Sequence, residues 1–425
     1  MAGTPPPRTR VAPERRTRLD LAVTAAIVVL VVVAGVLLWW TAPARSTELT
    51  TADEEPSAPL PTESLPTELH ELWRAPSPAT AVPAVARATV LTGHEGTMTG
   101  RDPQTGQPLW RYTRTAPLCA LAAAWPGGEN DALGVYRNRR GCSEVTALNA
   151  GTGARKGNRT SDADSRIALS YDRSYALAAG DTRLETWGTN LVRGIEYGRI
   201  EAPVNPETAP DRHDCTLHSA ISGADRVAVV ERCSGDTGYR LTVLSSTMTS
   251  EEKIRQWGSE LITESTAAAP PAVISVTDTT VTVYDGGGDP GSGHPGPTVR
   301  MFGHDALQRA ARSVSGEVTP PPGSRPLTAS GLTTYWTGRS TLVLDANSGQ
   351  ARVRIEDTIG PGEVATALMI PVPGAISLRD PVSGEELRKL PVDRGDYRGL
   401  VSLSVLGPYV IEQRGDQIVV LGPRG

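Results

Sequence analysis

The most constraining feature of the chain is an uncharged apolar run near its N-terminus. Leu21 to Trp40 reads LAVTAAIVVLVVVAGVLLWW, which is twenty residues without a charge. At about 1.5 Å of rise per residue, a helix of this length crosses a hydrocarbon core roughly 30 Å thick. Trp39 and Trp40 end the run, where indole rings favour the membrane interface. The run predicts a transmembrane helix over residues 19–40, with the membrane as a binding partner through Leu21 to Trp40.

The charges before the apolar run predict its orientation. Two acidic residues and five arginines precede it, the latter at Arg8, Arg10, Arg15, Arg16 and Arg18. By the positive-inside rule, residues 1–18 form a cytoplasmic basic tail and the chain after Trp40 is extracytoplasmic. A cleaved signal peptide is the alternative, because Ala42-Pro43-Ala44 offers small residues at alternate positions. Twenty apolar residues exceed the usual signal-peptide core of about 7 to 15, which favours a retained anchor.

The segment after the apolar run predicts a disordered tether over residues 41–67. It consists mainly of Pro, Thr, Ser, Ala and Glu, and it has little apolar surface to bury. It contains no Cys, which excludes a lipid-modified cysteine as the anchor. Residues 68–425 then form the extracytoplasmic domain.

Composition limits what this outer domain binds and how it folds. The formal net charge of -5 gives no general attraction to phosphate backbones, so a nucleic-acid partner is not expected. Gly (43) and Pro (35) are frequent, which favours a fold with many tight turns over a helical one.

A strand-turn-strand unit recurs in the outer domain. In each copy an apolar strand leads to Asp or Asn, and a Gly follows before the next strand. The clear copies place these residues at Asp102 and Gly106, Asn149 and Gly153, Asp345 and Gly349, and Asp380 and Gly384. Asp or Asn starts a turn by bonding nearby backbone, and Gly supplies the positive φ that closes the hairpin. Weaker copies occur at 184–188, 241–246 and 281–286, while residues 155–340 as a whole depart from the repeat.

The spacing of the units predicts the architecture. The turn glycines are 47 residues apart from 106 to 153 and 35 apart from 349 to 384. These distances match one four-stranded propeller blade. We therefore expect an all-β fold, a seven- or eight-bladed β-propeller preceded by one transmembrane helix. A pair of β-sandwich domains is the structural alternative.

One stretch of about forty residues carries a family resemblance. The sequence from Leu72-Trp73-Arg74, through Pro83–Gly96, to Asp102–Trp110 resembles a repeat of the pyrroloquinoline-quinone-type (PQQ-like) β-propeller family. The composition suggests a membrane-anchored bacterial member of actinobacterial type. In this family a Trp on the last strand of each blade packs between blades, and Trp110 holds that place here, whereas Trp187 falls on the preceding strand.

The cysteines predict disulfides. Four occur in the outer domain, at Cys119, Cys142, Cys215 and Cys233, and an extracytoplasmic compartment permits their oxidation. Of three possible connectivities, the repeat selects Cys119–Cys142 and Cys215–Cys233, because each pair joins the start of one strand to the end of the next. The alternative is a zinc site of His213, Cys215, His218 and Cys233, which lacks the usual close spacing of Cys ligands.

The search for catalytic motifs predicts no catalytic residues and no metal site. There is no G-x-S-x-G, H-E-x-x-H or G-x-x-x-x-G-K-[ST] sequence. His94 and His304 are interpreted as solvated loop residues. Asp285 to Asp289 could offer oxygens to Ca²⁺, but it lacks the EF-hand spacing and is interpreted as a flexible surface loop.

The family resemblance implies two functions. One is a quinoprotein oxidoreductase that depends on pyrroloquinoline quinone and Ca²⁺, but such enzymes carry an adjacent Cys-Cys pair and a Trp in nearly every blade, which this chain lacks. Other members, including a lipoprotein scaffold of outer-membrane barrel assembly, use the propeller as a protein-binding surface. We expect a non-enzymatic binding or scaffolding module without a cofactor, with a protein or cell-envelope ligand, and keep the oxidoreductase as the alternative.

Overall fold

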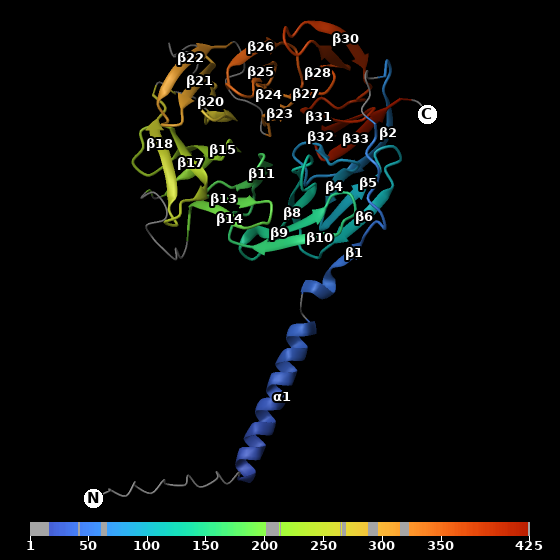
Figure 1. The fold of residues 1–425 in the computed structure, drawn as a ribbon, viewed down its shortest axis with the longest axis vertical. Helices are drawn as coiled ribbons and strands as arrows, with labels where there is room; N and C mark the ends of the chain where they lie inside the picture. The colour runs from blue at the N-terminus through green and yellow to red at the C-terminus, as the bar shows by residue number, and fades with distance from the viewer. Residues whose placement is uncertain are drawn as a thin grey trace, which may run out of the picture. The chain divides into compact units, whose positions relative to one another are not determined.

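The computed structural model describes residues 17–40, 43–60, 66–200, 212, 214–263, 265, 269–287, 296–314 and 323–423. Within these residues, one α-helix, α1 (Arg18–Trp40), precedes eight β-sheets (Figure 1). These described residues fall into two units, one that ends at Glu48 and one that begins at Leu49.

Helix α1 begins at a reciprocal cap. The Thr17 backbone N–H donates to Asp20 Oδ2 at 2.8 Å, and the Asp20 N–H donates to Thr17 Oγ1 at 3.2 Å, so two free donors of the first turn are satisfied. The helix has 23 residues, and none of them is buried. It is long and apolar enough to span a membrane, which fits either a single-pass anchor or a signal sequence.

The eight sheets are the blades of a propeller. Blade 1 contains β3 (Ala84–Val85), β4 (Val90–His94), β5 (Thr97–Arg101) and β6 (Pro108–Thr113). Blade 2 contains β7 (Leu118–Ala124), β8 (Asp131–Asn138), β9 (Gly141–Asn149) and β10 (Arg155–Thr160). Blade 3 contains β11 (Ala168–Tyr171), β12 (Tyr175–Ala179), β13 (Arg183–Gly188) and β14 (Arg193–Gly198). Blade 4 contains β15 (Thr216–Gly223), β16 (Arg226–Arg232), β17 (Arg240–Met248) and β18 (Ile254–Leu261).

The second half of the ring repeats this arrangement. Blade 5 contains β19 (Ala272–Val276), β20 (Thr280–Asp285), β21 (Thr298–Gly303) and β22 (Gln308–Ser313). Blade 6 contains β23 (Leu327–Ala329), β24 (Leu332–Trp336), β25 (Thr341–Asp345) and β26 (Ala351–Ile355). Blade 7 contains β27 (Glu363–Val364), β28 (Leu368–Val372), β29 (Ala375–Arg379) and β30 (Glu386–Pro391). Blade 8 contains β31 (Val401–Leu406), β32 (Tyr409–Arg414), β33 (Gln417–Gly422) and β2 (His70–Pro76).

Blade 8 closes the ring with the two ends of the domain. Its order is β31-β32-β33-β2, so the N-terminal strand β2 pairs antiparallel with the last strand of the chain, β33. In every blade the first strand lies towards the centre of the ring and the fourth at its rim (Figure 1). The predicted all-β propeller is confirmed with eight blades, and the alternative of two β-sandwich domains is wrong.

The repeat turns join the third and fourth strands of blades 1, 2, 6 and 7. In each turn the Gly N–H donates to the carbonyl of the preceding Asp or Asn, at 2.9 Å for Gly106 and 2.8 Å for Gly153. The Asp or Asn Oδ1 accepts from the next two free N–H groups, as in the bonds of 3.0 and 2.7 Å at Asp102. All four turn glycines have φ between +70° and +75°, the region that favours Gly.

These turns also press against the neighbouring blade. A Cβ on Gly153 would lie 2.8 Å from the Trp110 ring, and one on Gly106 would lie 2.7 Å from the Trp73 ring. Trp110 Nε1 donates to the Ala150 carbonyl at 2.8 Å, and Trp73 Nε1 donates to the Pro103 carbonyl at 3.0 Å. Trp73 therefore packs between blades in the same way as Trp110. The sequence had identified this role clearly only for Trp110.

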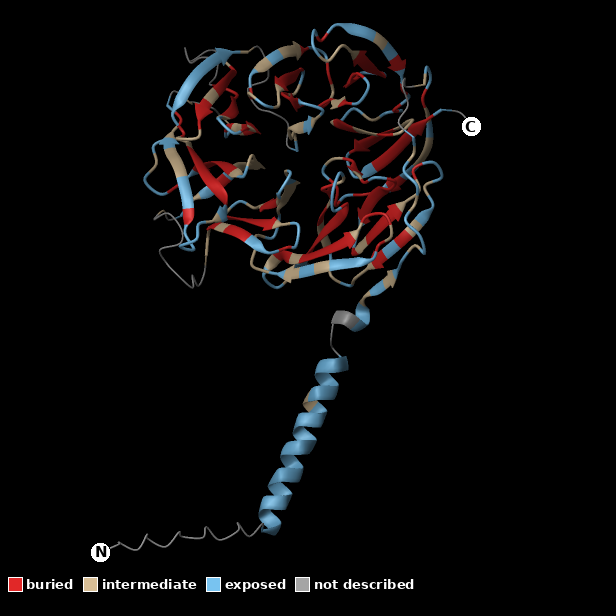
Figure 2. Ribbon diagram, in the orientation of Figure 1, coloured by how far each residue is buried: buried red, intermediate tan, exposed pale blue. Residues whose placement is uncertain are grey.

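The hydrophobic core is divided among the blade interfaces. One cluster combines Leu91, Met98 and Trp110 of blade 1 with Tyr136 and Leu148 of blade 2. Figure 2 shows buried residues on the strands around the whole ring and exposed residues mainly on the outer strands. A core of this kind grows with each blade, which is how a long chain avoids one oversized core.

The segment predicted as a disordered tether differs from that expectation in part. Residues 43–46 form a short 3-10 helix, η1 (Pro43–Ser46), and β1 (Glu48–Thr50) adds a fifth strand beside β6 of blade 1. Leu49 packs against the core between blades 1 and 2. The reason is that the outer strand of a blade leaves backbone donors and acceptors unpaired, and an extended segment can satisfy them.

Candidate binding face

The antiparallel order of each blade divides its connections between two faces of the ring. Face A carries the turns between first and second strands and between third and fourth strands. Face B carries the turns between second and third strands and the links to the next blade. The repeat turns at 102–107, 150–154, 346–350 and 380–385 therefore lie on face A. The links at 114–117, 161–167, 356–362 and 392–400 lie on face B.

A strap of residues 49–60 covers part of face A. The Ala52 N–H donates to the Thr152 carbonyl at 2.9 Å, and Asn130 Nδ2 donates to Glu55 Oε1 at 3.4 Å, both in turns of blade 2. Further along, Pro59 lies against Gly407 in the first turn of blade 8. The strap thus occupies face A at blades 2 and 8, on the opposite side of the ring from face B.

Both disulfides lie at face B. Cys119 and Cys142 have their Cα atoms 6.0 Å apart, and Cys215 and Cys233 have theirs 3.8 Å apart. These are the pairs expected from the repeat, although Cys142 is at the start of the third strand, β9, and not at the end of the second. The turn before β9 is short, so the third strand begins at Gly141, opposite Asn138 at the end of the second strand, β8. Disulfides suit an oxidising, extracytoplasmic compartment.

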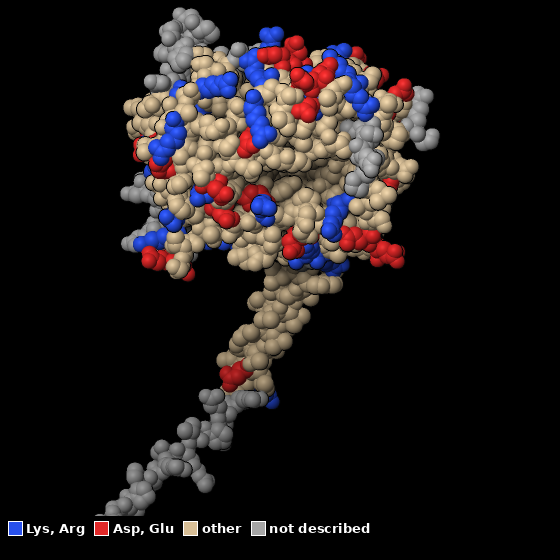
Figure 3. All heavy atoms as spheres, turned by 45° about the horizontal axis from the view of Figure 1, so that its top comes forward, with Lys and Arg blue, Asp and Glu red and all other residues tan. Residues whose placement is uncertain are grey.

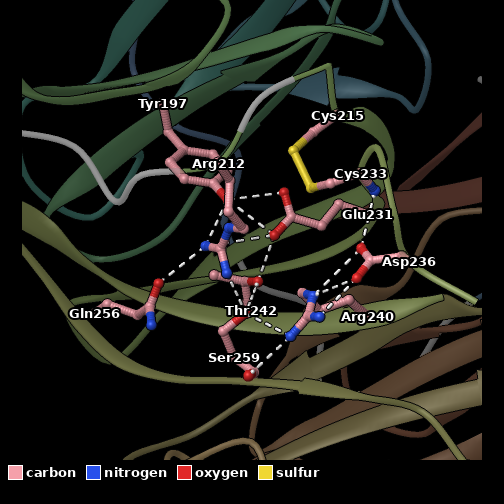
Figure 4. A network of polar contacts seen from close by, with 10 residues as sticks. All are labelled: Tyr197, Arg212, Cys215, Glu231, Cys233, Asp236, Arg240, Thr242, Gln256 and Ser259. Atoms are coloured by element: carbon pink, nitrogen blue, oxygen red, sulfur yellow. Dashed lines mark hydrogen bonds and ion pairs between the residues drawn. A yellow bond between two sulfur atoms is a disulfide. The ribbon is translucent and has the colours of Figure 1, made fainter.

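A polar network beside Cys215–Cys233 joins blades 3 and 4 (Figure 4). Its centre is Glu231, whose side chain is fully buried. Tyr197 of blade 3 donates its hydroxyl to Glu231 at 2.8 Å, and Thr242 donates to the same carboxylate. Arg212 lies 3.6 Å from Glu231 and donates to the Tyr197 hydroxyl at 2.8 Å. Burial, followed by the charge of Glu231, raises the pKa of Tyr197 well above its usual value.

A largely buried ion pair lies at the edge of this network. Arg240 Nη2 donates to Asp236 Oδ1 at 2.6 Å, and this bond holds the pKa of Asp236 below its usual value. The ligand atoms of Cys215, Glu231 and Cys233 lie within 4.8 Å of one another. Both sulfurs are in the disulfide and the carboxylate already has hydrogen bonds, so the arrangement links blades instead of offering thiolates to a metal.

Two titratable residues lie on strands next to the centre of the ring. Tyr171 ends β11 of blade 3 and Glu363 begins β27 of blade 7, on innermost strands of opposite blades. Tyr171 is 41% exposed, yet burial and then the charge of Glu363 raise its pKa. Burial raises the pKa of Glu363 to about 7. The Glu363 carboxyl therefore has a pKa near neutral pH.

A surface depression of about 700 Å³ lies between blades 7 and 8, and its lining includes Arg74, Asp393, Arg394 and Tyr397. Arg394 is fully engaged, because it bonds Glu412 at 2.7 Å and the carbonyls of Val372 and Ala375 at 2.9 and 3.2 Å. Its charge thus links two blades and is not directed into the depression.

Several residues singled out in the sequence have roles other than those expected. Asp285 is not in a flexible surface loop: it ends β20, is fully buried and accepts from Arg300 Nε at 2.9 Å. His304 is not simply solvated, since its ring lies edge-on to Trp257 with centroids 5.4 Å apart. His94 is exposed, as expected. His213 and Asp289 lie outside the described residues.

The network around Glu231 and the pair of Tyr171 and Glu363 were not found in the sequence. Their partners come from different blades, and no fixed spacing connects them. A basic stripe of the kind that binds nucleic acid is not visible in Figure 3, where Lys and Arg lie among Asp and Glu.

No protein-family model matches this chain, and no curated protein sequence matches it. Among solved structures, BamB from Moraxella catarrhalis matches with a TM-score of 0.48 and 11% identity, over 84% of this chain and 98% of that one. The dihydro-heme d1 dehydrogenase NirN in complex with DHE matches with a TM-score of 0.46 and 13% identity, over 77% of this chain and 67% of that one. The propeller assignment rests on the strand order above.

Proposed function

We propose that this chain is a membrane-anchored, extracytoplasmic propeller that binds a protein or cell-envelope ligand through face B, without catalysing a reaction. Residues 1–18 would be cytoplasmic, 19–40 would span the membrane, and the propeller would lie outside. The proposal includes kinship with PQQ-like propellers, which the eight-bladed ring and the repeat turns support.

One observation carries the choice of face. The strap occupies face A at blades 2 and 8, whereas both disulfides pin loops on face B. Loops that are held in place lose less freedom when a ligand binds, so they form a better binding surface than unconstrained loops.

Orientation is tested by thiol labelling of the full chain in intact cells. The four native cysteines are paired, so a single cysteine at the exposed Asn347 would be the reactive thiol. A membrane-impermeant maleimide is expected to label it without lysis. Labelling only after lysis would place the propeller in the cytoplasm and contradict the proposal.

Binding is tested by photocrosslinking in the same cells. A photoreactive amino acid at Asp396 samples face B of blade 7, and one at Val382, which is 75% exposed, samples face A of the same blade. We expect discrete adducts from Asp396 and from Asp357, another exposed face B position, and none from Val382. Adducts from Val382 alone would show that the ligand binds face A and not face B. The absence of adducts at all three positions would argue against a binding module. Dye-linked dehydrogenase activity after addition of pyrroloquinoline quinone and Ca²⁺ would instead favour the oxidoreductase.

A further inference from the structure

Exposed arginines gather at the face B end of blade 2. Arg137 is the last residue but one of β8, and Arg139 and Arg140 form the turn to β9, with all three residues exposed. Arg166, in the link to blade 3, has a side chain that is 85% exposed. We call these four residues the arginine cluster.

The two loops that carry the arginine cluster are fastened to each other. Arg137 Nη2 donates to the Ser165 carbonyl at 2.8 Å, and the Ala163 N–H donates to the Arg140 carbonyl at 3.1 Å. A Cβ at Gly141 would lie 2.1 Å from the Ala163 carbonyl, so the backbones touch. The Cys119–Cys142 disulfide fixes the base of the turn. The guanidinium groups are therefore presented from a preorganised backbone.

The acidic groups around the arginine cluster have other partners. Asp162 and Asp164 lie 3.8 and 3.5 Å from Arg199, and Asp164 also accepts from the Thr182 N–H at 2.7 Å. Glu144, on β9, accepts from Arg114 and from Asn138.

Within the described residues, Asp181 is the one carboxylate within 4.0 Å of a guanidinium of the arginine cluster, at 3.8 Å from Arg166. None of the described carboxylates lies within 4.0 Å of the guanidinium of Arg137, Arg139 or Arg140. A chain with a net charge of -5 thus carries a local excess of positive charge here.

We infer that the arginine cluster binds phosphate groups of an anionic cell-envelope component. Guanidinium groups pair with phosphate through two parallel hydrogen bonds, and several of them side by side fit a ligand with repeated phosphates better than a single carboxylate. The inference deepens the proposed function and rests on it, because it names the ligand chemistry of face B. An anionic lipid headgroup and a soluble phosphate polymer share this chemistry.

The test uses the full chain in nanodiscs of neutral phosphatidylcholine, so that its own membrane adds no anionic sites. Binding to fluorescent polyphosphate and to separate vesicles containing phosphatidylglycerol is measured as a function of salt. The variant Arg139→Gln/Arg140→Gln is compared with Arg111→Gln/Arg312→Gln, which removes two exposed charges from the outer strands of blades 1 and 5.

We expect the Arg139/Arg140 variant to bind at least tenfold more weakly, with a shallower salt dependence, and the control to change less than twofold. Binding to polyphosphate alone identifies a soluble polymer, binding to vesicles alone identifies lipid, and either result supports the inference. Absence of binding by the unmodified chain, or equal losses in both variants, overturns it. If phosphate binding fails but the Asp396 photocrosslinks still form, the inference about the arginine cluster is wrong and the proposed function stands. If the unmodified chain forms no photocrosslinks at Asp396, the proposed function itself is contradicted.

Discussion

Blades 1 and 2 meet through the repeat turn, whereas blades 3 and 4 meet through buried polar groups. At the first interface Gly153 packs on the ring of Trp110, and the indole N–H bonds the turn backbone. At the second, Tyr197 and Arg212 converge on Glu231 (Figure 4). The first interface thus uses a turn that recurs in the sequence, and the second uses polar residues that belong to no repeat.

The largest loss of stability is expected when the aromatic contact between blades 1 and 2 is removed. Trp110 is 1% exposed, so Trp110→Ala should lower the free energy of unfolding by about 4 kcal/mol, as measured by denaturant unfolding of the full chain in detergent. Trp110→Phe removes the bond to Ala150 and should cost about 1 kcal/mol. Trp187→Phe is the matched control from blade 3, because its indole nitrogen is buried without a hydrogen-bond partner and should cost less. Equal losses of stability for Trp110→Phe and Trp187→Phe would mean that the hydrogen bond from Trp110 to Ala150 does not stabilise its interface.

Breaking the polar interface between blades 3 and 4 should lower the stability somewhat less than Trp110→Ala does. Glu231→Gln leaves Arg212 near the network without a carboxylate, which should destabilise the protein by about 3 kcal/mol in the same measurement. Glu260→Gln, on the exposed side of blade 4, should change stability by no more than about 0.5 kcal/mol. A Glu231→Gln protein as stable as the control would show that hydrophobic contacts alone hold blades 3 and 4.

The comparison explains how much could be predicted from the sequence. Asp102, Asn149, Asp345 and Asp380 each lie four residues before their Gly, so the turn and its blade are visible in a single short window. Tyr197 and Glu231 are 34 residues apart and follow no repeat, so their contact depends on how two blades pack. The strap was missed for the same reason: its composition is that of a linker, and only the free edge of β6 makes β1 a strand.

The disulfides fall between these cases. The repeat predicted that Cys215 lies at the start of one strand and Cys233 at the end of the next, and the structure places them just before β15 and just after β16. It placed Cys142 one strand too early, because the turn at 139–140 is too short to show in the pattern. The proposal of face B as the binding face could not be made from the sequence, since it depends on where the strap lies.

A smaller effect separates the repeat turn from an ordinary turn. Gly153 and Gly374 have φ of +75° and +70°, but a Cβ would meet Trp110 at 2.8 Å in the first case and nothing within 4 Å in the second. Both Ala substitutions should lower the free energy of unfolding by about 1 kcal/mol because of the left-handed backbone. Gly153→Ala should lower it by about 1 kcal/mol more because the added methyl group overpacks against Trp110. Their difference in denaturant unfolding measures the blade contact, and no difference would mean that Trp110 moves aside freely.

The smallest effect concerns the centre of the ring, where Glu363 has a pKa raised to about 7 by burial, against an ordinary value of 4.5. A carboxyl with a raised pKa binds its proton more tightly in the folded state, so its contribution to stability is present below about pH 4.5 and is lost as the pH rises to 7. Glu363→Gln keeps a neutral side chain at every pH. The variant should come close to the unmodified chain at pH 5 and exceed it by roughly 1 kcal/mol at pH 8, after allowance for partial solvent access.

Thermal unfolding of both proteins at pH 5, 6, 7 and 8 measures this difference, with the exposed Glu385→Gln as the control. The gap should open between pH 5 and 7 and then stay constant, because the pKa of Tyr171, on the innermost strand of the opposite blade, is raised by burial and its hydroxyl remains neutral in this range. A gap of the same size at pH 5 and pH 8 would show that the carboxyl is solvated and that the centre of the ring is open to water at Glu363.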